Sequence, residues 1–330
     1  MVYRAALIGC GKIGSEFDDH PRVEGIYSHA GAYAAHAQTQ LVAVCDLDQN
    51  RLERCASRAN VKARFGDYQK MLAEARPDIV SVCTPDATHY DVLRDVINTP
   101  GVQAIFAEKP LALEIEQARE VVDAADARGI LLAVNYTRRY SNAYRELRQS
   151  LENGEFGRVQ AVSGYYTKGI LHNGTHWLDL ARYLLGEIVA VMGTGAQAGA
   201  GVDPTLNGTI EFADGVKACL HGCTFDDEVS FFEMDIVGTR GRVRLEDSGH
   251  LLRFYRLADN SQYAGFRKFT QIREADGELG FAMLTAVEDL AHALATQTQP
   301  RCTGRDALVA LTAAVALRDS ARTGCPVNLI

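Results

Sequence analysis

The stretch VYRAALIGCGKIG, residues 2–14, decides the fold of this 330-residue chain. Its apolar first half, residues 2–8, has the composition of a buried β-strand and leads directly into three spaced glycines. In this pattern Gly9 permits a tight turn, Gly11 lets a pyrophosphate approach the backbone, and Gly14 allows a helix to pack closely. A glycine-rich turn without a ligand would only cost stability. The spacing therefore favours a strand–loop–helix unit that binds a dinucleotide. The residues assigned to the cofactor here are Gly9, Gly11, Lys12, Ile13 and Gly14.

Further β-type runs alternate with helical patterns in the first third of the chain. Apolar strands separated by helices are typical of a parallel sheet that is covered on both faces. The predicted strands are residues 2–8, 41–45, 79–83, 103–107 and 130–134. Beyond residue 159 the strands follow one another through turns, which predicts a mainly antiparallel sheet. Its predicted strands are residues 209–212, 216–219, 233–237 and 242–245, with helices over residues 175–185, 281–295 and 305–322.

These patterns predict an α/β protein with two domains. Residues 1–120 are expected to form a Rossmann domain with a parallel sheet that binds the dinucleotide. Residues 121–330 are expected to form an α+β domain with a large, mainly antiparallel sheet, which serves substrate binding and oligomerisation. A chain of 330 residues is long enough to give each domain its own core.

Composition excludes several classes of protein. The net charge of −8 gives no support to a nucleic-acid partner, which needs a basic surplus. No apolar run is long enough to cross a bilayer, and no signal peptide is visible at the N-terminus. Eight cysteines are too few for a disulfide framework, so we expect reduced thiols and a cytoplasmic location. Cys219 and Cys223 flank His221 within a strand-like segment that lacks zinc-knuckle spacing, so no metal is expected.

A carboxylate ends the second predicted strand. Asp46 can accept hydrogen bonds from the adenosine ribose, and a 2′-phosphate there would meet a like charge, so the sequence favours NAD over NADP. Alternatively, Asp46 caps the next helix, a role that Asp48 can also fill. Arg51 and Arg54 lie close by in the sequence and keep NADP open as a cofactor.

An insertion interrupts the first helix. The glycine loop and Asp46 are separated by more than the roughly twenty residues that the fingerprint predicts. The excess falls in residues 15–28, which include His20 and Pro21, and the helix is expected to resume over residues 29–37. A lid beside the cofactor, a surface loop and a subunit contact all remain open for this segment.

Several motifs in a fixed order resemble the Gfo/Idh/MocA family of nicotinamide-dependent sugar and cyclitol oxidoreductases. They are the glycine loop, Cys83-Thr84-Pro85 with His89, Glu108-Lys109-Pro110, residues 135–140 (NYTRRY) and residues 172–179 (HNGTHWLD). The resemblance covers essentially the whole chain. It implies hydride transfer between nicotinamide and a carbinol carbon, with Thr84, Pro85, His89, Glu108 and Lys109 joining the cofactor-binding residues.

The resemblance also implies the two catalytic residues. Lys109 is similar to the lysine that hydrogen-bonds the reacting oxygen, where an ammonium stabilises alkoxide character. His176 is similar to the histidine that exchanges the hydroxyl proton, a role that suits imidazole near neutral pH. Helical spacing puts Asp179 on the same face as His176, so Asp179 can orient the imidazole. By spacing alone, His176 can equally be a core histidine that Asp179 satisfies.

One position departs from the family pattern. His172 stands where many members carry an aspartate, and Asn173 follows it. His172 and His176 are four residues apart, but the glutamate and the third ligand of a zinc site are missing, so no metal is expected there. We assign His172 and Asn173 to the substrate pocket. Tyr136 and Arg139 are further candidates there, because a guanidinium fits oxyanions, although Arg139 can instead form a surface ion pair.

Together these features predict an NAD-dependent dehydrogenase or reductase. Its substrate would be a small sugar-like molecule with a secondary hydroxyl: a sugar, a sugar nucleotide or a cyclitol. The alternative is a non-catalytic regulator of the same fold that binds a dinucleotide and a sugar. An antiparallel sheet with one face on helices leaves its other, apolar face in need of cover by a second subunit, which predicts a homodimer or homotetramer.

Overall fold

The computed structural model describes residues 2–19, 24–195, 203–226 and 229–329. The chain divides into two compact units. The first combines Met1–Ser141 with Leu279–Leu308, and the second combines Asn142–Glu278 with Val309–Ile330. Residues 20–23 of the predicted insertion, with His20 and Pro21, lie outside the described residues.

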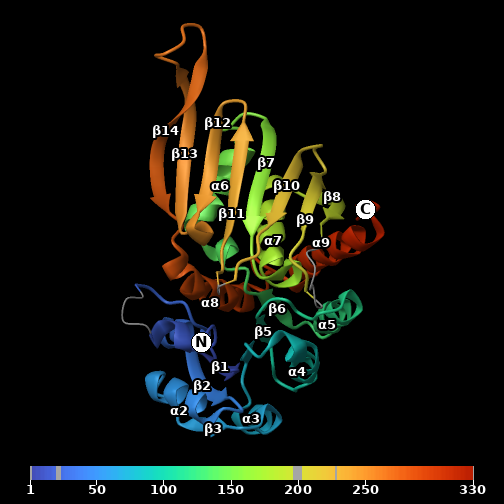
Figure 1. The fold of residues 1–330 in the computed structure, drawn as a ribbon. Helices are drawn as coiled ribbons and strands as arrows, with labels where there is room; N and C mark the ends of the chain where they lie inside the picture. Colours follow the sequence, from blue (N-terminus) through green and yellow to red (C-terminus); the bar gives the residue numbers. More distant parts are fainter. Residues whose placement is uncertain (1, 20–23, 196–202, 227–228, 330) are drawn as a thin grey trace. The chain divides into compact units, whose positions relative to one another are not determined.

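A six-stranded parallel sheet forms the centre of the first unit (Figure 1). Its strands are β1 (Tyr3–Ile8), β2 (Thr39–Cys45), β3 (Ala63–Phe65), β4 (Ile79–Val82), β5 (Ala104–Ala107) and β6 (Leu131–Val134). The order β3-β2-β1-β4-β5-β6 reverses direction between β1 and β4. In sheets of this kind ligands bind outside the carboxyl ends of the strands at the reversal. The predicted parallel sheet is therefore confirmed, and its switch point falls at the glycine loop.

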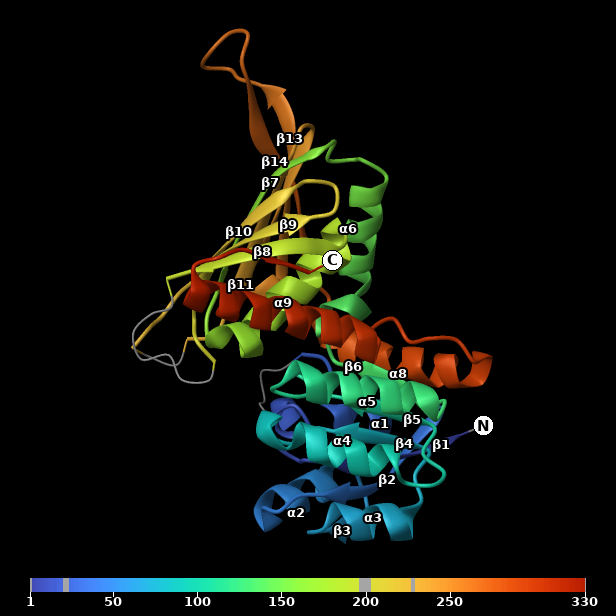
Figure 2. The same ribbon diagram turned by 90° about the vertical axis from the view of Figure 1, so that its right-hand side faces the viewer.

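Helices cover both faces of this sheet (Figure 2). They are α1 (His29–Ala35), α2 (Gln49–Arg58), α3 (Tyr68–Ala75), α4 (His89–Ile97), α5 (Ile115–Ala127) and α8 (Leu279–Thr296). Helix α4 packs on α5, whereas α8 packs on α1 and on strands β5 and β6. All residues of β4 and β5 are buried, as expected for strands with helices on both sides.

The first unit extends beyond residue 120. Strand β6 pairs in parallel with β5 and completes the sheet, so residues 121–141 lie with the dinucleotide-binding part of the chain. Helix α8 joins the same unit from far along the sequence because it packs on α1. A boundary at residue 120 would separate β5 from β6, which hydrogen-bond to each other, although the sequence predicts residues 130–134 as a strand of the same parallel sheet.

The second unit is built on a nine-stranded sheet in the order β14-β13-β12-β11-β7-β10-β9-β8-β15. Its strands are β7 (Val159–Tyr166), β8 (Ile188–Thr194), β9 (Asn207–Phe212), β10 (Lys217–Gly222), β11 (Phe232–Gly238), β12 (Gly241–Glu246), β13 (Leu251–Asp259), β14 (Arg267–Asp276) and β15 (Val327–Asn328). All neighbouring pairs are antiparallel except β7 with β10. The predicted mainly antiparallel sheet is confirmed.

One face of the larger sheet carries the core of the second unit. Its helices are α6 (Asn142–Glu152), α7 (Thr175–Leu185) and the greater part of α9 (Gly304–Thr323). Trp177 on α7 is fully buried, and its Nε1 donates to the Glu233 carbonyl of β11 at 3.1 Å. The residues that alternate with these core positions point to the opposite face of the sheet and are partly exposed. Tyr165, for example, is 45% exposed. None of the described helices combines the length and the apolar character needed to span a bilayer.

Candidate functional site

The glycine loop has the backbone that its spacing predicts. Gly9 adopts a φ of +95°, and a Cβ there would lie 2.4 Å from the Cys83 carbonyl oxygen. A Cβ on Gly14 would lie 2.1 Å from the Gly9 carbonyl oxygen. At Gly11, in contrast, the nearest atom would be Arg51 Nη1 at 4.0 Å. Gly9 and Gly14 are therefore glycines for reasons of packing, whereas the space beside Gly11 is open for a ligand.

The inserted segment loops out of the first helix. The amides of His29 and Ala30 at the start of α1 donate to the carbonyls of Ile13 and Gly14, at 3.1 and 2.9 Å. Helical hydrogen bonding thus resumes across the insertion. Within the insertion the chain forms turns and the short 3₁₀ helix η1 (Glu16–Asp19), and Ser28 caps α1 by accepting from Gly31. The predicted break of the first helix is confirmed.

A cavity of about 560 Å³ opens at the carboxyl ends of β1, β2 and β4. This volume is within the ordinary range for small-molecule sites. The lining residues are Ile8, Gly9, Gly11, Cys45, Asp46, Leu47, Asp48, Arg51, Gly66, Tyr68, Cys83, Thr84, Pro85, Thr88 and Val92. The structure therefore brings two predicted loop glycines together with Asp46 and the Thr84-Pro85 motif around one space. Lys12, on the same loop, is exposed and does not line it.

Asp46 is fixed at the mouth of this cavity by two backbone groups. Its Oδ2 accepts from the Cys10 amide and its Oδ1 accepts from the Asp48 amide, both at 2.7 Å. Asp48 is the residue that caps α2, because its side chain accepts from the Asn50 and Arg51 amides. Asp46 is thus not needed as a cap. A carboxylate offers about four acceptor positions, so Asp46 retains room for a ribose diol.

A buried hydroxyl supports a ligand in the same cavity. Among the described residues, Thr84 Oγ1 has no hydrogen-bond partner although it is buried. A buried polar atom without a partner costs about 1–3 kcal/mol. Together with the open space at Gly11 and the anchored carboxylate of Asp46, this atom fits a bound dinucleotide.

The Glu108-Lys109-Pro110 motif follows β5 and is buried. Glu108 and Lys109 are 7% and 8% exposed, and the peptide between Lys109 and Pro110 is cis. Glu108 Oε1 accepts from His29 Nε2 at 3.0 Å and from Asn135 Nδ2 at 2.6 Å. Burial acts to raise the pKa of Glu108, but the His29 and Asn135 hydrogen bonds and the charge of Lys109 outweigh it and lower that pKa.

His89 joins the two strand-end motifs. Its Nδ1 lies 2.6 Å from the Pro110 carbonyl oxygen, and its Nε2 lies 2.7 Å from the Thr84 carbonyl oxygen. The ring is buried, with 1% of the residue exposed. His89 therefore links the backbone that follows β4 to the backbone that follows β5.

In the second unit, the predicted histidines lie on a π-helix, Gly169–Gly174, and on the α-helix α7 that continues from it. Asp203 organises this segment: its carboxylate accepts from the Leu171 amide at 2.7 Å and from the His172 amide at 3.0 Å. The His176 ring is half-buried and stacks on Phe232, with the ring centres 6.0 Å apart and nearly parallel planes. π-Helical turns occur frequently at functional sites.

Sequence reasoning did not identify Asp203 or Phe232. Neither residue belongs to a recognisable motif: Phe232 begins β11, Asp203 lies between β8 and β9, and both are far along the chain from the histidines. Of the other predicted residues in this unit, Asp179 is buried, and Asn173 Nδ2 donates to Ser230 Oγ at 3.2 Å.

Tyr136 and Arg139 lie in the first unit, after β6. Tyr136 is 2% exposed. Arg139 is 5% exposed, and its Nη1 lies 3.3 Å from Asp306 Oδ1. This ion pair joins a buried guanidinium to a carboxylate that is 18% exposed. Among the described residues, no group of three or more histidine, cysteine or acidic side chains is arranged to hold a metal ion.

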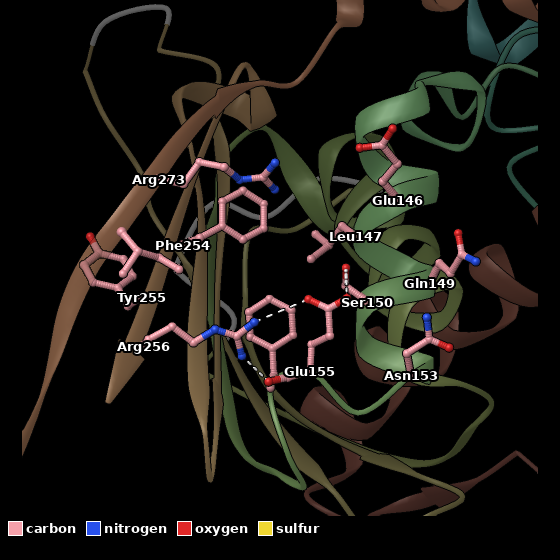
Figure 3. Close-up of a pocket in the computed structure, with 12 residues that line it drawn as sticks. Glu146, Leu147, Gln149, Ser150, Asn153, Glu155, Phe254, Tyr255, Arg256 and Arg273 are labelled. Atoms are coloured by element: carbon pink, nitrogen blue, oxygen red, sulfur yellow. Dashed lines mark hydrogen bonds and ion pairs between the residues drawn. The ribbon is translucent and has the colours of Figure 1, made fainter. Parts of the chain in front are cut away.

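A second cavity, of about 470 Å³, lies in the second unit between α6 and strands β13 and β14 (Figure 3). Arg273 extends over the Phe254 ring, 4.0 Å from its centre, and Arg256 Nη2 lies 3.3 Å from Glu155 Oε2. None of the residues predicted for the cofactor or the substrate lines this cavity.

The parallel sheet, its glycine loop and the cavity beside them define a dinucleotide-binding protein of the Rossmann type. Residues 3–136 match the family described as "Oxidoreductase family, NAD-binding Rossmann fold", and residues 144–244 match "GFO/IDH/MocA C-terminal domain". The chain belongs to the GFO/IDH/MocA oxidoreductase family, as its motifs predicted. It is an enzyme of the NAD-binding oxidoreductase class.

Individual relatives extend this comparison. The chain is 28% identical to the D-glucoside 3-dehydrogenase of Escherichia coli, over 64% of this chain and 67% of the relative. It is 25% identical to the scyllo-inositol 2-dehydrogenase (NAD(+)) of Bacillus subtilis, over 99% of this chain and 96% of the relative. A levoglucosan dehydrogenase solved with NADH has the same fold, with a TM-score of 0.83, 19% identity and full coverage of both chains.

Proposed function

We propose that the enzyme transfers a hydride between NAD and a secondary hydroxyl carbon of a sugar, a sugar nucleotide or a cyclitol. The observation that carries this proposal is the cavity in which Gly11, Asp46 and the unpartnered Thr84 hydroxyl meet. The names of the relatives support the substrate class, because glucosides and inositols both carry secondary hydroxyls. When NAD is bound, its nicotinamide accepts or donates the hydride.

Distinct groups of this chain would hold the cofactor. The backbone at Gly9, Gly11 and Gly14, with Lys12 and Ile13, would contact the pyrophosphate. Asp46 would accept from the adenosine ribose. Thr84, Pro85 and Lys109 would contact the nicotinamide half, while His89 and Glu108 hold the backbone of those motifs in place through the contacts described above.

Lys109 and His176 would carry the proton and charge chemistry. In the oxidation direction the carbinol C–H bond breaks, its electron pair leaves with the hydrogen, and the O–H proton passes to the imidazole of His176. The ammonium of Lys109 donates to the same oxygen and stabilises its developing negative charge. Asp179 would orient His176, and the reverse direction returns the proton from the imidazolium.

Substrate recognition is assigned to His172 and Asn173, with Tyr136 and Arg139 as further candidates. A histidine at position 172 replaces the aspartate of the inositol-type pattern. An imidazole both donates and accepts hydrogen bonds, whereas an ionised carboxylate only accepts. We therefore propose a sugar or sugar nucleotide ahead of a free inositol as substrate.

A substrate screen tests this proposal. Sugars, sugar nucleotides and inositols are offered with NAD and with NADP, and reduction of the nicotinamide is followed by absorbance. Turnover of at least one polyhydroxylated substrate with NAD is expected. Failure of every compound with a chain that still binds NAD would contradict the proposed activity and would favour a ligand-binding regulator.

We also propose that the enzyme is a homodimer or homotetramer in the cytoplasm. The outward face of the large sheet is partly exposed and carries charged side chains that pair across strands, such as Arg253 Nη1 with Glu246 Oε2 at 3.2 Å. Such a surface suits an isologous contact, in which each charge can meet its opposite on a second copy. All eight cysteines are free, which fits a reducing compartment. Light scattering tests the assembly, and a monomer would contradict it.

A further inference from the structure

The inserted segment contacts a row of arginines on α2. Arg51, Arg54 and Arg58 are spaced three and four residues apart, so they lie along one side of the helix. The carboxylate of Glu16, on η1, forms an ion pair with Arg54 Nη2, and its Oε1 lies 3.8 Å from Arg51 Nε. Asp19, at the end of η1, forms an ion pair with Arg58. Glu16 and Asp19 therefore face the arginines of α2. The carboxylate of Asp18 instead accepts from the Tyr27 amide and the Ser28 hydroxyl within the insertion.

Arg51 is the member of this row that borders the cofactor cavity. It lines the cavity together with Asp46 and Asp48, and its Nη1 is the atom nearest to the open space at Gly11. Its side chain is 49% exposed, so it can reorient without disturbing the core. In dinucleotide-binding folds, an arginine near the acidic residue that ends the second strand accommodates a 2′-phosphate. Arg51 thus has the position and the charge to recruit NADP, and Arg54, three residues further along α2, adds to the positive charge.

We infer that Glu16 is a specificity-determining residue that keeps Arg51 and Arg54 from serving a 2′-phosphate. The inference rests on the proposed cofactor cavity and is independent of the substrate. A carboxylate beside two guanidinium groups cancels part of their positive potential, and its hydrogen bond with Arg54 occupies one donor of that residue. The 2′-phosphate of NADP would have to displace Glu16 and also approach Asp46. NAD, which lacks that phosphate, meets neither obstacle.

The insertion thereby has a role in the choice between NAD and NADP. Residues 15–19 are not merely excess length between the glycine loop and Asp46. They place one carboxylate against the arginines of α2 and anchor it, because Arg58 Nη1 donates to Ser15 Oγ at 2.9 Å. The preference for NAD therefore depends on two acidic residues, Asp46 on the strand and Glu16 on the insertion.

The test is the equilibrium binding of NAD and of NADP to the purified enzyme. Calorimetry measures both affinities, and no substrate is needed. In Glu16→Gln we expect the affinity for NADP to rise about five-fold, the effect of freeing partly exposed cations. The affinity for NAD should change less than two-fold. Glu53→Gln is the matched control: Glu53 lies on α2 beside the row, but its Oε2 pairs with Arg64 Nε at 3.3 Å.

A double variant separates a direct contact from a general charge effect. Adding Arg51→Gln to Glu16→Gln should remove most of the gain, and raising the salt concentration should reduce it. An unchanged NADP affinity in Glu16→Gln, or an equal gain in Glu53→Gln, would overturn the inference. If the unaltered enzyme did not bind NAD, the proposed cofactor site itself would be contradicted. Failure of the inference about Glu16 and failure of the proposed cofactor site are therefore distinguishable.

Discussion

The imidazole Nε2 of His29 lies 3.0 Å from Oε1 of Glu108, and both residues are buried, at 0% and 7% exposure. Because an ionised carboxylate only accepts hydrogen bonds, Nε2 carries the proton in this pair. The residue that follows Glu108 is Lys109, the proposed partner of the reacting oxygen. His29 begins α1 directly after the insertion, so this pair connects the start of α1 to the strand end that carries the lysine.

The pH dependence of stability reports on this buried pair. The pKa of Glu108 is lowered in the folded protein, because the His29 hydrogen bond and other favourable contacts outweigh the opposing effect of burial. Its stabilisation is therefore complete above the unfolded pKa of about 4.3 and is lost as the pH falls through the lower, folded pKa. Glu108→Gln should cost about 2–4 kcal/mol at neutral pH. Urea unfolding at several pH values should show a flatter acid dependence in this variant. An acid limb as steep as that of the unaltered protein would contradict the assignment.

Replacement by alanine should lower stability at one glycine of the loop and weaken NAD binding at another. Gly9→Ala forces a Cβ against the Cys83 carbonyl at a positive φ, so we expect a loss of about 2 kcal/mol or more in the free energy of unfolding. Gly11→Ala meets no protein atom closer than 4.0 Å and should leave stability nearly unchanged. It should nevertheless weaken NAD binding at least about ten-fold, because a methyl group occupies the path of the pyrophosphate. Thermal unfolding and NAD titration of both variants check this pair, and tight NAD binding by Gly11→Ala would count against the cavity as the cofactor site.

Asp203 is expected to act as a positioning residue for the histidine segment. Asp203→Ala removes the acceptor of the Leu171 and His172 amides, so the π-helix before α7 should loosen. We expect kcat to fall about ten-fold, with the affinity for NAD unchanged because the cofactor cavity lies in the other unit. Asp203→Asn keeps one acceptor oxygen and should recover part of kcat. A purely structural role would lower the melting temperature of both variants without this graded effect on kcat.

His176 should be needed for turnover and not for cofactor binding. His176→Gln keeps the hydrogen-bonding capacity of the side chain but cannot exchange a proton near neutral pH, so we expect kcat to fall about 10²- to 10⁴-fold. NAD affinity should be retained. His292→Gln on α8, an exposed histidine, serves as the control. Near-normal kcat in His176→Gln would show that another group exchanges the proton.

The parts of the fold that rest on local patterns could be predicted from the sequence. The helix predicted over residues 175–185 is confirmed; its apolar residues Trp177, Ala181 and Leu184 share one face. The parallel strands were identified by their continuous apolar runs. The sequence did not predict the short strand β3 (Ala63–Phe65), because three residues are too few to show a pattern. It did not predict the long strand β14 (Arg267–Asp276) either, because that strand is exposed along most of its length and carries few apolar residues.

The candidate site likewise has a part that the sequence predicts and a part that only the packed structure reveals. The glycines of the loop have a spacing that physical chemistry explains, Asp46 ends the next predicted strand, and the structure brings Gly9, Gly11 and Asp46 to one cavity. The contacts of His29 with Glu108, of Asp203 with the π-helix and of Glu16 with Arg54 join residues far apart in the chain. No periodicity or motif records such contacts. They arise only when strands and helices pack, which is why the sequence left the insertion without a role.

The proposed role of Lys109, stabilising charge on the reacting oxygen, is tested by the rate of hydride transfer in Lys109→Ala with NAD saturating. We expect kcat to fall about 10²- to 10³-fold with NAD still bound, since the electrostatic contribution is removed while the cavity remains. Lys70→Ala, on the exposed side of α3, is the matched control and should retain full activity. A Lys109→Ala enzyme that turns over its substrate at the normal rate would contradict the account.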